Sequence, residues 1–179
     1  MKNNYLIIGD TTIINIEKKN GTMIKMLIDT EDLRLLDHYN AIGIGYYRGV
    51  ESYYAKINIY KGWNEDKGRY DYKTLMVHRL IAKVKGNKRV DHINHNTLDN
   101  RKSNLRITNQ SDNLKHRSGK NSNNKSGYRN VSFIQNKWVV QLQVNGKNTM
   151  LGRFDDVDEA GKYAEKMREK YYKEFKGIN

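Results

Sequence analysis

Residues 137–154 read KWVVQLQVNGKNTMLGRF, and this stretch describes a β-hairpin. Asn145-Gly146 is a strong signal for a two-residue hairpin turn, and it stands between two runs of β-forming residues. In the first run, apolar side chains recur at every second position from Trp138 to Val144, as expected of a strand with two different faces. The stretch therefore predicts two antiparallel strands joined by a tight turn.

A third strand and a helix flank this hairpin. Gln135-Asn136 separates it from a further β-forming run, and FDDVDEA at residues 154–160 places acidic residues in and before the first turn of a helix. The expected strands are residues 128–134, 137–144 and 147–154. The expected apolar face of the helix comprises Ala160, Tyr163, Ala164, Met167, Tyr171 and Phe175. We therefore expect a three-stranded antiparallel sheet with one face on the helix and a polar, exposed face opposite.

Upstream of this region, residues 116–127 read HRSGKNSNNKSG and contain almost no apolar side chain. This composition predicts an extended basic linker over residues 116–126. Residues 127–179 then form a separate sheet-plus-helix domain.

The formal net charge of the chain is +13, and most of it falls between residues 78 and 126, which carry 12 Lys and Arg against 3 Asp and Glu. Residues 1–77 carry 11 against 10, and residues 127–179 carry 10 against 7. Such a basic segment indicates a polyanionic partner, most simply nucleic acid.

The 179 residues include no cysteine, which excludes disulfides, thiol nucleophiles and Cys-based zinc sites. Any metal must therefore use oxygen or imidazole ligands. The chain has no apolar run of about 18 residues and no signal-peptide pattern, so we expect a soluble, cytoplasmic protein without a membrane partner.

Residues 1–74 predict a β-rich region in which no catalytic pattern is found. SYYAKINIY at residues 52–60 alternates as a strand, and Asp29 or Thr30 is placed to cap a short helix. Further short apolar runs, separated by turn signals, are residues 5–8, 11–16 and 23–27.

The densest group of reactive side chains is in residues 90–107, VDHINHNTLDNRKSNLRI. Histidine titrates near neutrality, so His92 is a candidate general base. The oxygens of Asp and Asn are hard ligands that favour Mg²⁺ or Mn²⁺ over zinc, and magnesium needs only one or two protein ligands. Asp91 with one Asn oxygen therefore suffices for a metal site suited to phosphodiester hydrolysis.

With VHRLIA upstream and NQSDN downstream, the pattern VDHIN and LDNRKSNLR resembles the HNH nucleases, also called ββα-metal nucleases, and within them the phage and intron-encoded homing endonucleases. The resemblance implies that His92 is the general base and that Asn104 orients the loop or the base. It implies that Asp91 and Asn113 hold the divalent metal. The intervals from His92 to the two asparagines, 12 and 21 residues, agree with the homing-type members. The final ligand is Asn113 rather than the histidine of the HNH name, which implies modest metal affinity.

Alternatives remain for some of these roles. Asn109 and Asp112 compete with Asn113 as the second ligand. His95 stands three residues after His92, a spacing that imitates a zinc-binding pair, but no further soft ligand follows.

The positions of three other residues also leave a choice. His78 is either structural or a phosphate contact, and Asn104 can cap the segment that follows it. Asp91 is adjacent to His92, so in a regular strand the two would face opposite sides. The site therefore needs a strand end or a bulge at this point.

Basic residues surround the motif, and few acidic residues offset them, so we expect them to contact DNA phosphates rather than remain solvated. These residues are Arg79, Arg101, Lys102 and Arg106.

The C-terminal region carries a second resemblance. SGYRNV, KWVVQL, LGRF and DEA-x-x-YA look like the ethylene-response-factor type (APETALA-type) DNA-binding domain of plants. The resemblance implies that the exposed sheet face lies in the DNA major groove, with Trp138 turned to the core. The expected contacts are Arg129, Ser132, Gln141, Gln143, Asn148 and Met150. Gln and Asn pair well with adenine edges, so we expect an AT-richer site than that of the plant domains.

Together these observations predict an α+β protein with four segments. They are a β-rich region (1–74), an HNH nuclease core (75–115), the basic linker (116–126) and the C-terminal DNA-binding domain (127–179). The expected function is metal-dependent cleavage of double-stranded DNA by a monomer or homodimer. The alternative is a DNA-binding regulator with an inactive nuclease fold.

Overall fold

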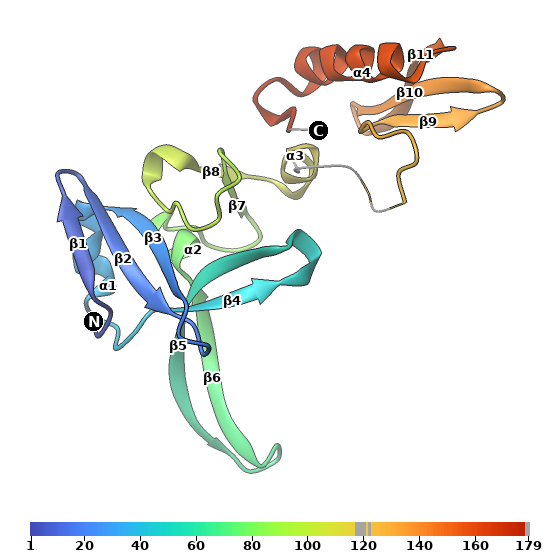
Figure 1. Cartoon of the computed structure of the whole chain (residues 1–179). Coiled ribbons are helices and arrows are strands. Elements are labelled where there is room, and N and C mark those ends of the chain that lie inside the picture. The colour runs from blue at the N-terminus through green and yellow to red at the C-terminus, as the bar shows by residue number, and fades with distance from the viewer. Residues whose placement is uncertain (117–120, 122, 178–179) are drawn as a thin grey trace. The chain divides into compact units, whose positions relative to one another are not determined.

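A computed structural model describes residues 1–116, 121 and 123–177, except the side chains of Gln110, Ser111 and Asn113 (Figure 1). It divides into two compact units, residues 1–108 and 109–179. The chain is α+β and rich in strands, as predicted. Within the described residues, no helix combines the length and the apolar character needed to span a membrane.

The first unit begins with a three-stranded antiparallel sheet in the order β1-β2-β3. Its strands are β1 (Tyr5–Ile8), β2 (Thr11–Glu17) and β3 (Met23–Asp29), which contain the three short apolar runs of the predicted β-rich region. A short 3-10 helix, η1 (Thr30–Asp32), and one turn of α-helix, α1 (Leu33–Leu36), follow directly. The expected side-chain cap is absent there, because the Asp29 carboxylate accepts a hydrogen bond from the distant Lys102 amide instead.

A second antiparallel sheet follows in the order β4-β5-β6, with a 3-10 turn before β5. Its elements are β4 (Gly43–Tyr47), η2 (Arg48–Val50), β5 (Ser52–Asn64) and β6 (Arg69–Met76). Ala55 and Ile57 are buried on one face of β5, which confirms the predicted alternation. The strand itself is four residues longer than expected and forms a long hairpin with β6 (Figure 1).

The remainder of the first unit carries the predicted motif. Its elements are α2 (Val77–Ile81), β7 (Arg89–His92), η3 (Lys102–Asn104) and β8 (Leu105–Thr108). β7 and β8 pair as an antiparallel hairpin whose long connection contains the loop from Ile93 to Arg101.

One hydrophobic core serves the whole first unit. It combines residues of both sheets, of α1 and α2, and of the segment before β4, namely Ile14, Ile16, Met26, Ile28, Leu33, Leu36, Ile42, Ala55, Ile57, Val77 and Ile81. Leu98 and Leu105, from the motif, pack against it. The β-rich region and the described strands of the motif therefore form one compact unit, because α2 and the motif bury apolar side chains in the core that these sheets build.

The second unit contains α3 (Gln110–Lys115), β9 (Val131–Ile134), β10 (Lys137–Val144), β11 (Lys147–Phe154), α4 (Val157–Tyr172) and η4 (Lys173–Phe175). The sheet order β11-β10-β9 is the predicted one. Asn145 and Gly146 have φ angles of 50° and 79°, as the predicted tight hairpin turn requires. Asp156 caps α4, since its side chain accepts a hydrogen bond from the Glu159 amide at 2.7 Å.

The apolar face of α4 differs from the prediction near its end. Tyr171 is 40% exposed, whereas Tyr172 is buried and its hydroxyl accepts a hydrogen bond from the Gln143 amide. Arg168 is also buried, and its guanidinium donates to the Arg129 carbonyl at 3.1 Å. The buried side of α4 therefore continues at intervals of four residues from Ala164. Helical periodicity alone allows either Tyr171 or Tyr172 to be the buried residue at this end.

Candidate active site

Asp91 and His92 lie at the end of β7, where the strand gives way to the motif loop. In the hairpin register Asp91 faces Arg106 and His92 faces Leu105. Successive side chains on a strand point to opposite faces, so Asp91 is directed to its partner across the hairpin and His92 to the interior. β7 ends only after His92 and has no bulge between the two residues, so the strand end does not bring the Asp91 and His92 side chains to one face.

His92 is buried among aromatic rings. The centroid of its ring lies 5.3 Å from that of His78 and 5.9 Å from that of Tyr54. Its Nε2 is 3.2 Å from Oδ1 of Asn100, which is itself buried. An amide oxygen only accepts hydrogen bonds, so with Asn100 in this orientation the ring donates through Nε2 and keeps its lone pair on Nδ1.

Burial keeps both histidines neutral. Desolvation lowers the pKa of His92, against the hydrogen bond with Asn100 and the charges of Asp91 and Asp99, which raise it. Desolvation and the neighbouring charges of His92 and Arg79 lower the pKa of His78 to about 3. At neutral pH the His92 imidazole is therefore in the form that can accept a proton.

Asp91 forms an ion pair with Arg106 across the hairpin. The distances from its Oδ2 are 2.8 Å to Nε and 2.7 Å to Nη2 of Arg106. Both side chains are largely buried, at 12% and 16% exposure. Arg106 thus compensates the Asp91 charge in a position where a bound cation would also be attracted.

Asn104 fixes the loop between the two strands. Its Oδ1 accepts a hydrogen bond from the Asn94 amide at 2.9 Å, and its Nδ2 donates to the Asp99 carbonyl at 2.8 Å. The Asn104 carbonyl accepts from the Ile93 amide at 2.9 Å. Asn104 ends η3 and precedes a strand, so it supports the loop rather than capping a helix.

Asp99 is a second centre of the same loop. Arg101 donates two hydrogen bonds of 2.8 and 2.7 Å to its carboxylate, and the Asn94 side chain donates a third of 3.1 Å. The hydrogen bonds from Arg101 are the main reason that the pKa of Asp99 lies below its usual range. Arg101 therefore has a structural partner besides any phosphate it contacts.

The first sheet anchors this loop by main-chain hydrogen bonds. The Leu27 amide donates to the Leu98 carbonyl at 2.9 Å, and the Asn100 amide donates to the Leu27 carbonyl at 2.8 Å. From the second sheet, the Tyr53 carbonyl accepts from the Thr97 hydroxyl at 2.6 Å. The N-terminal region, which shows no catalytic pattern in sequence, thus holds Asn100 against His92. No local sequence signal indicates the two bonds with Leu27, because main-chain bonds place no constraint on side-chain type.

Lys102 and Arg79 also have partners within the first unit. The Lys102 ammonium contacts Glu31 at 2.5 Å and the buried Asp32 at 2.9 Å, and hydrogen bonds to these two carboxylates raise its pKa to about 12. Arg79 donates to the carbonyls of Lys88 and Gly86 at 2.7 and 3.0 Å. All four basic residues predicted to contact phosphates thus have contacts within the chain, and their contact with DNA stays a prediction.

The predicted second ligand, Asn113, lies in α3, but its side chain is outside the described residues. Its two competitors have partners. Asn109 is the N-cap of α3 and accepts from the Asp112 amide at 2.8 Å, while Asp112 pairs with Lys115 at 2.7 Å. In the part of the chain that the structure describes, no three His, Asp or Glu side chains gather as a metal site, which also leaves the HxxH pair with His95 without a third ligand.

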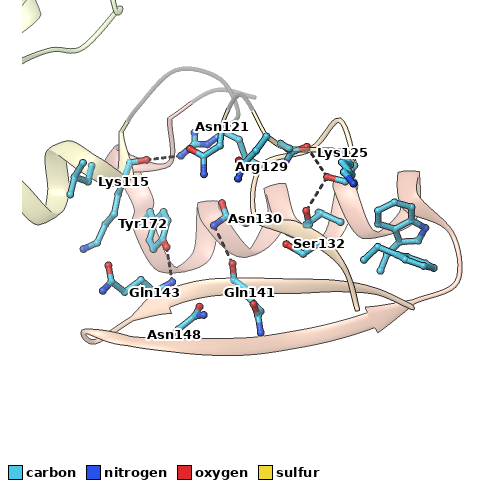
Figure 2. Close-up of a pocket in the computed structure, with 17 residues that line it drawn as sticks. Lys115, Asn121, Lys125, Arg129, Asn130, Ser132, Gln141, Gln143, Asn148 and Tyr172 are labelled. Carbon is cyan, nitrogen blue, oxygen red and sulfur yellow. Dashed lines mark hydrogen bonds between the residues drawn. The ribbon is translucent and has the colours of Figure 1, made fainter. Parts of the chain in front are cut away.

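The exposed sheet face of the second unit borders a groove of ≈ 700 Å³ (Figure 2). Gln141, Gln143 and Asn148 line it from the strands, and Lys125 from the segment across it (Figure 2). Of the other predicted contacts, Ser132 and Met150 are exposed.

Arg129 corrects the prediction of an exposed contact. It is only 5% exposed, and its guanidinium donates to the carbonyls of Lys115 and Lys176 at 3.0 and 3.3 Å. The arginine is drawn inward because it connects α3 with the C-terminal end of the unit. Trp138 packs against the core, as expected, with its ring 4.8 Å from that of Phe133.

The chain is similar to a known protein that bears the HNH name. It is 29% identical over 131 residues to an uncharacterized HNH endonuclease of Acanthamoeba polyphaga mimivirus, and the match covers 70% of this chain and 68% of the relative. No family model matches the chain, and no solved structure matches it. The similarity supports the resemblance to HNH nucleases that the motif around Asp91 and His92 carries.

Proposed function

We propose that this chain is a metal-dependent DNA endonuclease of the HNH homing type. The observation that carries the proposal is the contact of the buried His92 ring with Asn100 through Nε2, which leaves Nδ1 as the atom with the lone pair, on the strand that also carries Asp91. The similarity to a protein named as an HNH endonuclease supports the same class.

In this proposal His92 takes the proton of the water that attacks the scissile phosphate. Its buried ring is neutral at neutral pH, and the hydrogen bond to Asn100 directs the proton to Nε2, so Nδ1 is the accepting atom. The phosphodiester bond to the 3′ oxygen breaks, which leaves 5′-phosphate and 3′-hydroxyl ends. Asn104 acts through the loop, because its side chain joins the two ends of the segment that presents Asn100.

Asp91 and Asn113 are the residues proposed to hold one Mg²⁺ or Mn²⁺. Both side chains supply hard oxygen atoms, and a metal of this kind needs few protein ligands. When bound, the metal would supply positive charge for the developing charge on the leaving oxygen. Asp91 fits this role as a carboxylate that Arg106 orients by two short contacts.

Two surfaces are proposed to bind the DNA. Basic residues of the first unit, Arg79, Arg101, Lys102 and Arg106, would add phosphate contacts to their contacts within the chain. In the second unit the proposed base contacts are Ser132, Gln141, Gln143, Asn148 and Met150, in agreement with the resemblance to ethylene-response-factor type domains. The amide side chains favour adenine, so we expect tighter binding to AT-rich than to GC-rich duplexes, and equal binding would contradict this preference.

A supercoiled-plasmid assay tests the proposal. With Mg²⁺ the wild-type chain is expected to convert supercoiled DNA to nicked or linear product, and EDTA is expected to abolish the conversion. His92→Ala should lose the activity, whereas His38→Ala, at an exposed histidine of the same unit, should retain it. Cleavage that needs no metal, or that survives in His92→Ala, would overturn the assignment.

The Asp91–Arg106 ion pair favours a second candidate, a DNA-binding regulator whose nuclease fold is inactive. A guanidinium on the predicted ligand lowers the attraction for a cation. This candidate predicts duplex binding without any metal-dependent nicking.

For the proposed nuclease, one active site per chain favours nicking by a monomer, and a double-strand break would imply a homodimer.

A further inference from the structure

The long β5–β6 hairpin extends beyond the sheet from which it starts. β4 pairs only with residues 52–56 of β5, so residues 57–64 and 69–75 form a two-stranded ribbon (Figure 1). From this hairpin, Ala55 and Ile57 belong to the core of the first unit, and Ile59 and Leu75 pack against it, all near the base of the hairpin. Core packing therefore does not explain the length of the ribbon.

One face of this ribbon carries a row of aromatic rings, Tyr60, Trp63, Tyr70 and Tyr72, which we call the aromatic face. Each side chain is between 55% and 57% exposed. Tyr60 pairs with Tyr72 and Trp63 with Tyr70 across the strands, and the ring centroids lie 5.0 to 5.8 Å apart. Such mutual packing orders the rings before any partner binds, which reduces the entropy lost on binding.

The aromatic face is continuous with the candidate active site. Side chains at every second position of a strand share a face, so Tyr54, Lys56, Asn58 and Tyr60 follow one another on this side of β5. Tyr54 is the residue whose ring contacts His92 and His78. The face thus begins beside the proposed base and leads away from it along the ribbon.

The charges on the hairpin suit a polyanion. Residues 52–76, all of which the structure describes, contain five basic and three acidic residues. None of the acidic residues lies on the aromatic face, since Glu65 and Asp66 are in the turn and Asp71 pairs with Gly62 on the other side. Lys56 adds a positive charge on the aromatic face itself.

We propose that the aromatic face docks into the major groove of duplex DNA on one side of the scissile phosphate. This inference rests on the proposed nuclease function, because its position is defined relative to His92. The major groove of B-DNA admits a two-stranded β-ribbon, and apolar side chains contact thymine methyl groups there. Tyrosine hydroxyls and the Asn58 amide add hydrogen-bonding groups for base edges and phosphates.

The length of the strand fixes where the contact falls. From Tyr54 to Tyr60 the strand advances about 20 Å, and Trp63 lies about 10 Å further. At about 3.4 Å per base pair these distances correspond to about six to nine base pairs from the cleaved bond.

Binding of a labelled duplex tests the docking. The probe is a fluorescein-labelled duplex of about 30 base pairs and mixed sequence, titrated with the full chain in EDTA. The double variant Tyr60→Ala, Tyr72→Ala should bind about tenfold more weakly, whereas Tyr60→Phe, Tyr72→Phe, which keeps the rings, should lose less. Tyr5→Ala removes an exposed tyrosine from β1 and should stay within about twofold of the wild type. Circular dichroism shows whether each variant is folded.

Chemical protection locates the contact. Once the nick is mapped by primer extension, guanine N7, which lies in the major groove, should be protected from dimethyl sulfate about six to nine base pairs to one side. The alanine double variant should lose this protection.

Several results would overturn the proposal. The first is a folded alanine double variant that binds the duplex as tightly as the wild type does. The second is a loss of affinity for single-stranded DNA of the same sequence that equals the loss for the duplex. The third is that the wild type forms a dimer and that the substitutions dissociate this dimer. The nuclease assignment fails separately. If the plasmid is never cleaved but the alanine variant still loses duplex affinity, the docking stands and the proposed activity does not. If cleavage is normal and the affinity is unchanged, only the docking fails.

Discussion

His92 and Asn100 are eight residues apart in sequence, and their contact decides which nitrogen of the imidazole carries the proton. A histidine that acts as a base must offer its lone pair on the atom that faces its substrate. In this chain an amide oxygen, rather than a carboxylate, determines which nitrogen of the His92 ring carries the proton. Asn100 is thus a positioning residue, and it has no assigned role in the HNH resemblance.

Replacing Asn100 with alanine is expected to slow plasmid nicking by about 10 to 100-fold, because the ring loses the partner that fixes its tautomer and orientation. Asn100→Asp keeps an acceptor at the same place and should retain more activity than the alanine variant. Initial nicking rates of the folded variants measure the effect. Asn40→Ala, at an exposed asparagine, is the matched control. Equal rates for Asn100→Ala and the control would show that Asn100 does not position the base.

At the scale of secondary-structure elements, β3 and the turn after it support the motif. Asp29 accepts a hydrogen bond from the Lys102 amide at 2.7 Å. The main-chain amide and carbonyl of Leu27 form hydrogen bonds with Leu98 and Asn100 of the loop. The turn that leads to Asn104 is therefore fixed from the N-terminal sheet.

Asp29→Ala is expected to lower the free energy of unfolding by about 1 kcal/mol, because it leaves the Lys102 amide without its charged acceptor. Urea denaturation measures the change, and plasmid nicking should slow in parallel. Asp10→Ala removes an exposed carboxylate from the neighbouring turn and should change neither value. A destabilisation as large in Asp10→Ala would point to a general charge effect instead.

The contact between α4 and the segment before β9 predicts that alanine at Gly161 lowers the stability of the chain, although alanine usually stabilises a helix. A Cβ at Gly161 would lie 2.5 Å from the Tyr128 ring, which a 2.6 Å hydrogen bond to Asp158 holds in place. Although alanine favours a helix by about 1 kcal/mol, Gly161→Ala should destabilise the chain by about 1 kcal/mol net. Thermal unfolding followed by circular dichroism tests this, with Lys162→Ala as the exposed control. A stabilised Gly161→Ala variant would mean that the tyrosine ring moves aside at little cost.

Local signals predicted most elements, and they failed where distant segments meet. The Asn145-Gly146 turn and the alternation on β10 are properties of a few neighbouring residues, so the bounds of β10 and β11 were predictable to the residue. The bulge in their pairing at Val140 and Gln141 was not predicted. The order of Asp91, His92 and Asn104 likewise indicated the candidate site, and the roles of these residues stay predictions. The attachment of the loop to Leu27 and the inward turn of Arg129 depend on tertiary packing, which no short pattern encodes.

At the scale of the whole molecule, the proposed catalytic histidine of the first unit also contributes to the packing of that unit. The rings of Tyr54, His78 and His92 join β5, α2 and β7 beside the hydrophobic core. Both histidines are buried in their neutral form, so the folded chain resists protonation more than the unfolded chain does.

This resistance predicts a loss of stability in acid. The pKa of His78 is about 3 in the folded chain and about 6.5 when unfolded, so below pH 6.5 the unfolded chain binds the additional proton. The free energy of unfolding should therefore fall as pH decreases through this window, by at most about 1.4 kcal/mol per pH unit for this residue. Urea denaturation at about pH 7.5 and pH 5 measures the slope. His78→Phe keeps a ring there and should reduce the slope, and an unchanged slope would assign the effect to other groups.

The central claim is that His92 is the base that activates water for DNA cleavage, and chemical rescue tests it most directly. The nicking rate of His92→Ala on supercoiled plasmid with Mg²⁺ is measured with and without added imidazole. We predict a rate at least about 100-fold below the wild type that rises with imidazole concentration, because the free base replaces the missing ring. A variant that nicks the plasmid as fast as the wild type without imidazole would contradict the claim.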